Sequence, residues 1–176
     1  MPTRSAHIYA IAIGSNQPRS AKLTPRLLVE KAMAKLSSKP FTCLAASSLL
    51  STAPLGPARR CYVNAAVLIG TALTPDALLA RLHKMERKAG RKRRLKWGAR
   101  TLDLDIILWS GGVWAENGLC IPHPAFRDRD FVLAPLIEIA RDWRDPITGF
   151  RPRHLLSRLK KPHGISKAVD RRGHAL

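Results

Sequence analysis

The chain has 176 residues, and 31 Lys and Arg against 12 Asp and Glu give it a formal net charge of +19. With 45% hydrophobic residues, it can form one domain with a sizeable core, but no apolar run approaches the roughly 20 residues of a membrane-spanning helix. The N-terminus does not resemble a signal peptide, and three widely spaced cysteines without a CxxC motif argue against a disulfide framework or a zinc site. We therefore expect a soluble, reduced, cytoplasmic protein.

Alternating and helical hydrophobic patterns predict six main elements in the order strand, helix, strand, strand, helix, strand. The strands are expected at 7–13, 41–52, 62–71 and 102–109, and the helices after Thr24-Pro25 and Thr74-Pro75. A threonine followed by proline is typical of a helix start, because the hydroxyl caps free N–H groups and proline fits the first turn. This order predicts an α+β fold of the ferredoxin-like βαββαβ type, an antiparallel sheet with helices on one face.

Two further helices are expected after these elements, a short one at 131–140 despite Pro135 and another near 153–160. Prolines and glycines become frequent from residue 141 on. We therefore predict one main domain over 1–150 and a basic extension over 151–176, formed by a short helix and a mobile tail.

The positive charge is concentrated in two segments. Residues 81–100 carry a net charge of +9, residues 151–176 carry +7, and the other 130 residues carry +3. Such clusters favour binding of a polyanion, either a nucleoside triphosphate or a nucleic acid backbone, although a solvated surface remains an alternative, above all for the C-terminal segment.

The segment Thr101–Leu108 contains the most informative pair of residues. Asp103 and Asp105 are two positions apart on a predicted strand, so they point to the same face with Cα atoms about 7 Å apart. Two carboxylates beside phosphate oxygens suit Mg²⁺, although acids at a strand end can also simply face water. Four arginines precede them, namely Arg91, Arg93, Arg94 and Arg100. Carboxylates for a metal beside cations for phosphates are typical of phosphoryl transfer, and the absence of GxxxxGK and GxGxxG excludes a P-loop or Rossmann site.

Other segments contain residues whose role the pattern alone leaves open. His123 and two arginines, Arg127 and Arg129, stand before a predicted helix, and a lone histidine is more often structural than catalytic. Tyr62 and Asn64 share a strand face, and Trp97 is an aromatic residue in a cationic segment that could stack on a flat ring.

Taken in order, these segments resemble the hydroxymethyldihydropterin pyrophosphokinase family of folate biosynthesis. The matching stretches are Ala12–Asn16, Thr52–Pro57, Tyr62–Ala66, Gly90-Arg91, Trp97–Asp105, Pro122–Pro124 and Arg129–Leu136. Each is short, but the ordered set runs in register over about residues 8–140 and is specific.

The resemblance implies transfer of the β,γ-pyrophosphoryl group of ATP to the hydroxymethyl oxygen of the pterin, with release of AMP. By similarity, Asp103 and Asp105 hold two Mg²⁺ ions, and the catalytic set consists of these acids with Arg91 and Arg100. The residues implied in ATP binding are Arg91, Arg100, His123 and Arg129.

The resemblance also implies a pterin site. Asn64 matches the residue that reads the hydrogen-bonding edge of the pterin, and Phe131 matches an aromatic residue that stacks on the ring. The other residues implied at the pterin are Thr52, Leu55, Tyr62 and Trp97.

Ala99 stands where the family usually has proline, and a shorter preceding segment leaves open whether Arg93 or Arg94 is a phosphate contact. The basic segment 151–176 matches no motif. The partners expected are ATP and a dihydropterin, bound by a monomer without membrane contact. The alternative is a ferredoxin-like nucleic-acid-binding module, which is disfavoured because only 6% of residues are aromatic and carboxylates occupy the key strand. A pterin-binding protein without catalysis is disfavoured because both acids and both matching arginines are present.

Overall fold

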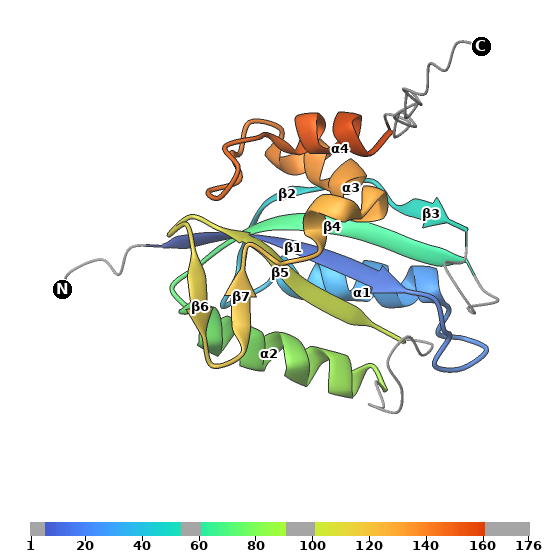
Figure 1. The fold of residues 1–176 in the computed structure, drawn as a ribbon. Helices are drawn as coiled ribbons and strands as arrows, with labels where there is room; N and C mark the ends of the chain where they lie inside the picture. The colour runs from blue at the N-terminus through green and yellow to red at the C-terminus, as the bar shows by residue number, and fades with distance from the viewer. Residues whose placement is uncertain (1–5, 54–60, 91–100, 161–176) are drawn as a thin grey trace, which may run out of the picture.

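The computed structural model describes residues 6–53, 61–90 and 101–160 (Figure 1). Four of the predicted site residues, Leu55, Arg91, Trp97 and Arg100, lie outside these ranges. The strands are β1 (His7–Ser15), β2 (Thr42–Ala46), β3 (Leu50–Thr52), β4 (Tyr62–Thr71), β5 (Asp103–Trp109), β6 (Trp114–Glu116) and β7 (Leu119–Ile121). The helices are α1 (Pro25–Leu36), α2 (Pro75–Lys88), the 3-10 turn η1 (Phe126–Asp128), α3 (Asp130–Ala140) and α4 (Pro152–Lys160).

The main sheet has the strand order β2-β4-β1-β5, with β3 also paired to β4, and every pairing is antiparallel. This confirms the predicted α+β, ferredoxin-like βαββαβ arrangement. Both predicted helix starts are also confirmed, because Thr24 and Thr74 are the N-caps of α1 and α2, each followed by proline.

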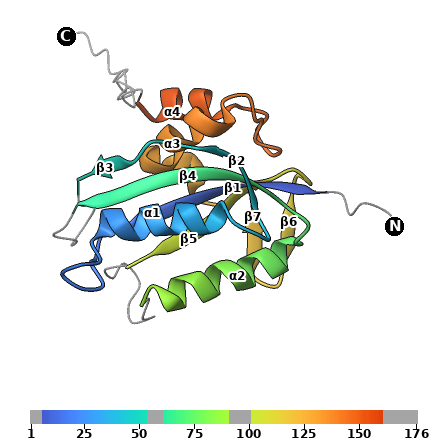
Figure 2. The same cartoon turned by 180° about the vertical axis from the view of Figure 1, so that it is seen from behind.

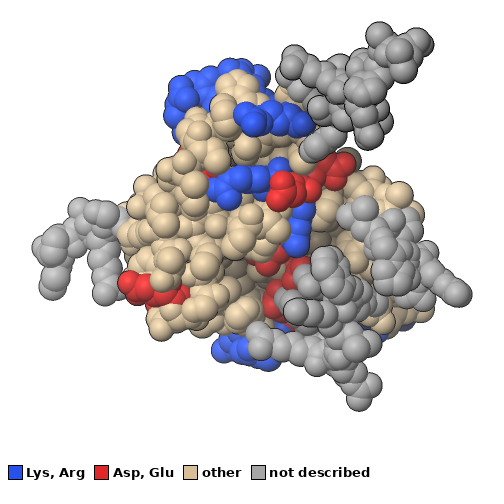
Figure 3. All heavy atoms as spheres, in the orientation of Figure 1, with Lys and Arg blue, Asp and Glu red and all other residues tan. Residues whose placement is uncertain are grey.

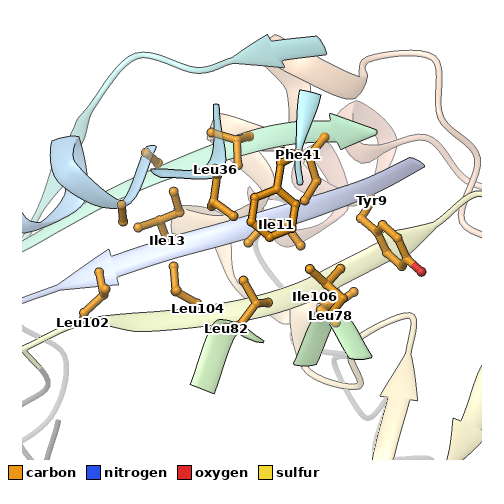
Figure 4. Packing of buried hydrophobic residues seen from close by; sticks show 14 of the residues in the cluster. Tyr9, Ile11, Ile13, Leu36, Phe41, Leu78, Leu82, Leu102, Leu104 and Ile106 are labelled. Atoms are coloured by element: carbon orange, nitrogen blue, oxygen red, sulfur yellow. The ribbon is translucent and has the colours of Figure 1, made fainter. Parts of the chain in front are cut away.

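Helices cover both faces of the sheet, whereas the sequence pattern predicts them on one face only. Helices α1 and α2 lie against one face, and α3 and α4 lie against the other (Figures 1 and 2). Successive residues of β1 point alternately toward the two helical layers and pack in the core on either side of the sheet. Tyr9, Ile11 and Ile13 pack in the cluster beneath α1 and α2 (Figure 4), and Ala10 packs in the cluster beneath α3 and α4. Because β1 is buried on both faces, it reads as a continuous apolar run.

The predicted strand over 41–52 is two strands, separated at residues 47–49. The N–H of Ser47 donates to the carbonyl of Ala66 at 2.9 Å, and its Oγ accepts from the Ala66 N–H at 2.9 Å. The next residue, Ser48, donates from both its N–H and its Oγ to Glu138 of α3, each at 2.8 Å. The hydrogen bonds of these two serines therefore interrupt the strand and connect it to α3.

The β6–β7 hairpin was not predicted. Its turn contains Asn117 and Gly118, both with positive φ (51° and 76°), and Asn-Gly is a strong signal for a tight hairpin turn. Beyond it, α4 packs on α3 and η1, with Leu155 only 7% exposed. Within the described ranges, none of the helices has both the length and the apolar character needed to cross a membrane. All three cysteines are free thiols.

Candidate active site

A pocket of about 380 Å³ lies between the sheet and the segment that enters α3. Its floor is the face of β1, β4 and β5 opposite to α1 and α2, and its wall is the stretch from η1 into α3. The lining residues on the strands include Ala12, Gly14, Asn64, Asp103 and Asp105, and those on the wall include Ala125, Asp128, Arg129, Phe131 and Val132.

Strand register brings the polar residues of the floor together. Gly14 on β1 pairs with Asp103 on β5 and with Asn64 on β4, and Ala12 pairs with Asp105. Gly14 and Ala12 are the two small residues between the polar side chains. A Cβ at Gly14 would lie 3.3 Å from Oδ1 of Asn64, so the missing side chain leaves room for the amide.

Asp103 and Asp105 both line the pocket, as their spacing predicts, while Leu104 between them is buried in the core on the opposite face. The N–H of Leu104 donates to Oε1 of Glu86 at 2.9 Å. Glu86 comes from the C-terminal turn of α2 and is 3% exposed. This bond ties β5 to α2 at the residue between the two acids.

The donor set suits a hard cation that completes its coordination with phosphate oxygens. No group of three or more His, Cys, Asp or Glu side chains gathers into a metal cage among the residues that the structure describes. Two carboxylates on one strand face match the preference of Mg²⁺ for few protein carboxylates together with substrate phosphates and water.

The other half of the floor can recognise a flat polar ring. Asn64 is 5% exposed and its Nδ2 donates to Oγ1 of Thr52 at 3.0 Å. Thr52 pairs with Tyr62 between β3 and β4, and all three residues line the pocket. The shared strand face of Tyr62 and Asn64 is confirmed.

The wall of the pocket carries one cation and one aromatic ring from the start of α3. Arg129 is the N-cap residue of this helix, and its guanidinium carbon lies 5.9 Å from the centre of the Phe131 ring. Asp128, the last residue of η1, is exposed and also lines the pocket. The wall therefore places a positive charge near an aromatic face.

His123 stands near these groups but does not line the pocket itself. Its Nδ1 accepts a hydrogen bond from the Ala125 N–H at 3.2 Å. Burial lowers the pKa of His123, the carboxylates of Asp105 and Asp103 oppose this change, and Arg129 reinforces it. Because Nδ1 accepts this hydrogen bond, the neutral form of the His123 ring carries its proton on Nε2.

The two arginines at 127 and 129 have separate environments, which the sequence did not distinguish. Arg129 lines the pocket, whereas Arg127 donates from Nε and Nη2 to the carboxylate of Asp145, both at 2.7 Å. Sequence analysis also missed Ala12, Gly14 and Asp128. Ala12 and Gly14 are small residues two positions apart on a strand that ends in a turn, and this pattern could have indicated a site on that strand face.

Seven predicted residues come together around this pocket, namely Thr52, Tyr62, Asn64, Asp103, Asp105, Arg129 and Phe131. Acidic and basic side chains gather side by side in the middle of the face shown in Figure 3, while tan surface predominates around them. A pocket with carboxylates and a guanidinium at one part, and an amide with aromatic rings at another, can bind a flat polar ring next to an anionic group. The fold and the pocket thus define an α+β protein suited to joining these two kinds of ligand.

Comparison with known proteins shows which family the chain matches. A family model described as 7,8-dihydro-6-hydroxymethylpterin-pyrophosphokinase (HPPK) matches residues 10–141. The chain is 41% identical over 133 residues to the 2-amino-4-hydroxy-6-hydroxymethyldihydropteridine pyrophosphokinase of Haemophilus influenzae, covering 75% of this chain and 81% of the relative. It is 39% identical over 138 residues to the protein of the same name from Pseudomonas aeruginosa, covering 77% and 82%.

A third relative of that name, from Synechocystis sp., is 45% identical over 103 residues, covering 58% of this chain. The match spans about half of that relative, 53% of its length. The chain belongs to the HPPK family.

Proposed function

We propose that this protein transfers the pyrophosphoryl group of ATP to 6-hydroxymethyl-7,8-dihydropterin, giving the pterin diphosphate and AMP, in folate biosynthesis. Family membership and the names of the relatives support this activity. The observation that carries it is the pocket, in which Asp103 of β5 and Asn64 of β4 flank the same glycine of β1, and Asp105 lies beside Asp103 on the same strand face. A ring bound at the amide has its substituent next to the carboxylates.

Asn64 is assigned to the hydrogen-bonding edge of the pterin. Its Nδ2 is already directed at Thr52, which fixes the amide plane and leaves Oδ1 as an acceptor for ring N–H groups. Phe131 is assigned to stacking on the ring, with Thr52 and Tyr62 at its edge. The assignments of Leu55 and Trp97 to the pterin site rest on the family resemblance.

Asp103 and Asp105 are assigned as the residues that would hold Mg²⁺, two ions by the family resemblance. Their shared strand face, their place at the pocket and their oxygen donors fit this cation. When bound by these carboxylates, Mg²⁺ would supply positive charge that stabilises the phosphate oxygens.

Arg129 and His123 are assigned to the nucleotide, and Arg91 and Arg100 to its phosphates. A bond forms between the hydroxymethyl oxygen and the β-phosphorus, and the bond between the β-phosphorus and the oxygen that stays with AMP breaks; the hydroxyl proton passes to solvent. Guanidinium groups stabilise the phosphate oxygens during this exchange through paired hydrogen bonds. Alignment and electrostatic stabilisation supply most of the rate, with little covalent work for the protein.

Incubation with ATP, Mg²⁺ and the dihydropterin tests the proposal. The expected result is AMP formation that requires both the pterin and Mg²⁺. Formation of ADP would contradict pyrophosphoryl transfer, and absence of any turnover would contradict the enzyme.

The nucleic-acid alternative is tested with three alanine variants. Arg100→Ala should impair turnover severely, whereas Lys84→Ala and Arg87→Ala, which remove exposed charges of α2, should have almost no effect. A nucleic-acid-binding module predicts a similar modest loss of RNA binding in all three, each lowering the salt dependence by about one unit.

We also infer that the protein is a cytoplasmic monomer with a single catalytic domain over 1–150. Free thiols at all three cysteines are compatible with a reducing compartment. Sedimentation of the purified chain tests the monomer directly.

A further inference from the structure

The pocket wall is tethered to a segment that lies beyond the family match. Arg127 belongs to η1, immediately before the wall residues Asp128 and Arg129. Its Nε donates to Oδ2 of Asp145 and its Nη2 donates to Oδ1, each at 2.7 Å. Asp145 follows α3 and is outside residues 10–141, which the HPPK family model matches. The contact therefore joins the wall to a part of the chain that the family pattern does not cover.

Asp145 is held in one place by its own surroundings. The residue is 2% exposed. Besides the two bonds from Arg127, its carboxylate accepts from the Thr148 hydroxyl and from the Ile147 N–H. Its backbone closes the loop, because its N–H donates to the carbonyl of Phe150 at 2.9 Å and its carbonyl accepts from the Gly149 N–H at 2.8 Å. The carboxylate is therefore a fixed anchor.

The two sides of Arg129 are bonded differently: its carbonyl accepts from the N–H groups of Val132 and Leu133 in α3 at 3.1 and 3.0 Å, whereas the bonding toward η1 is weak. Inside η1 the Arg129 N–H reaches the Phe126 carbonyl at 3.4 Å, near the limit of a hydrogen bond. The buried ring of Phe126, 1% exposed, and the Arg127 contact hold the turn in place. By contrast, Phe131 is followed by Val132 and Leu133, which are buried in the core beneath α3.

From this geometry we infer that Asp145 is a positioning residue for the nucleotide side of the site: through Arg127 it fixes η1 and so places Arg129 at the pocket. This inference rests on the proposed function for the identity of the ligand. Asp145 touches no ligand itself. Its loss should weaken binding of the ATP side and leave the pterin side, which the packing of α3 holds, nearly unchanged.

Two variants break the tether in different ways. Asp145→Asn keeps the size of the side chain but removes its charge and one acceptor, and Arg127→Lys keeps the charge but removes the paired geometry. The matched control is Asp142→Asn in the same segment. It removes an ion pair with Arg151 (3.5 Å) rather than a contact with η1, and the Asp142 side chain is 71% exposed. A thermal melt confirms that each variant is folded.

The measurements are dissociation constants of a non-hydrolysable ATP analogue with Mg²⁺ and of the pterin alone. Both tether variants should raise the constant for the ATP analogue about tenfold, within the range by which groups outside a site alter binding at it. The constant for the pterin should change less than about twofold, and Asp142→Asn should match the wild type in both. Equal losses for the two ligands, or unchanged ATP binding in both folded tether variants, would overturn the inference.

Amide hydrogen exchange separates this inference from the proposed function. Exchange over residues 126–130 should accelerate in both tether variants, while the amides of Val132 and Leu133 stay protected. If the wild type bound no ATP, the proposed function would fail, but the exchange pattern would still decide whether Asp145 positions η1. Unchanged exchange over 126–130 would overturn the positioning role.

Discussion

Replacing Gly14 by Ala tests the geometry of the pocket floor with the smallest possible change. Gly14 lies between Asp103 and Asn64 in the register of the sheet. An added Cβ would stand 3.3 Å from Oδ1 of Asn64, tighter than ordinary van der Waals contact. The amide would therefore shift by a few tenths of an ångström from the position that its hydrogen bond to Oγ1 of Thr52, 3.0 Å long in the wild type, now gives it.

The expected effect falls on pterin binding rather than on folding. An acceptor that no longer meets its partner in a buried site loses about 1–3 kcal/mol, which corresponds to a dissociation constant raised about 5- to 150-fold. The strand itself gains from the change, because alanine has less conformational freedom to lose on folding than glycine, an effect of about 0.5–1 kcal/mol. The free energy of unfolding should therefore stay close to that of the wild type.

Gly70→Ala is the matched control in the same sheet. A Cβ there would meet Leu44 at 3.9 Å and the Thr42 carbonyl at 4.0 Å, both ordinary contacts. Titration of each variant with the pterin, followed by urea unfolding, measures the two effects separately. Unchanged pterin affinity in Gly14→Ala, or an equal loss in both variants, would refute the reasoning.

Three further predictions follow from the site and its support. Asp103→Asn and Asp105→Asn should each lower turnover by about 100-fold or more without unfolding the protein; near-normal turnover in both would remove the metal assignment. Burial alone would raise the pKa of Asp145, but hydrogen bonds from Arg127, Thr148 and the Ile147 N–H outweigh it and lower the pKa. The stability from Asp145 is thus present above the ordinary carboxyl pKa and is lost as the pH falls, so the free energies of unfolding of wild type and Asp145→Asn should converge in acid; a constant difference would contradict this. Leu155→Ala should lower the free energy of unfolding by about 2–4 kcal/mol, because Leu155 is buried in the same cluster as Phe126. Leu159 of the same helix is 37% exposed, so Leu159→Ala should change this free energy by less than about 0.5 kcal/mol. Equal changes in the two variants would contradict the packing of α4.

The sequence by itself determined the order of the elements and much of the floor of the pocket. Residues on one strand share a face whenever they are two apart, so the pairs Asp103 with Asp105 and Tyr62 with Asn64 were predictable from spacing alone. Helix starts at Thr24-Pro25 and Thr74-Pro75 were equally local, because capping involves only neighbouring residues. The family resemblance added which of these residues act on the metal, the ATP and the pterin.

Only the tertiary structure decided which partners these residues meet. Strand register placed Gly14 between Asp103 and Asn64, a contact between segments about 50 and 90 residues apart that no local pattern encodes. It also separated two arginines that read alike in sequence, since Arg127 found a buried carboxylate beyond α3 and Arg129 reached the pocket. The second helical layer, α3 and α4, likewise depends on packing. The apolar residues that it covers alternate along β1 with those that pack beneath α1 and α2. In the sequence the two sets therefore appear as one uninterrupted apolar run, which does not show that both sheet faces are covered.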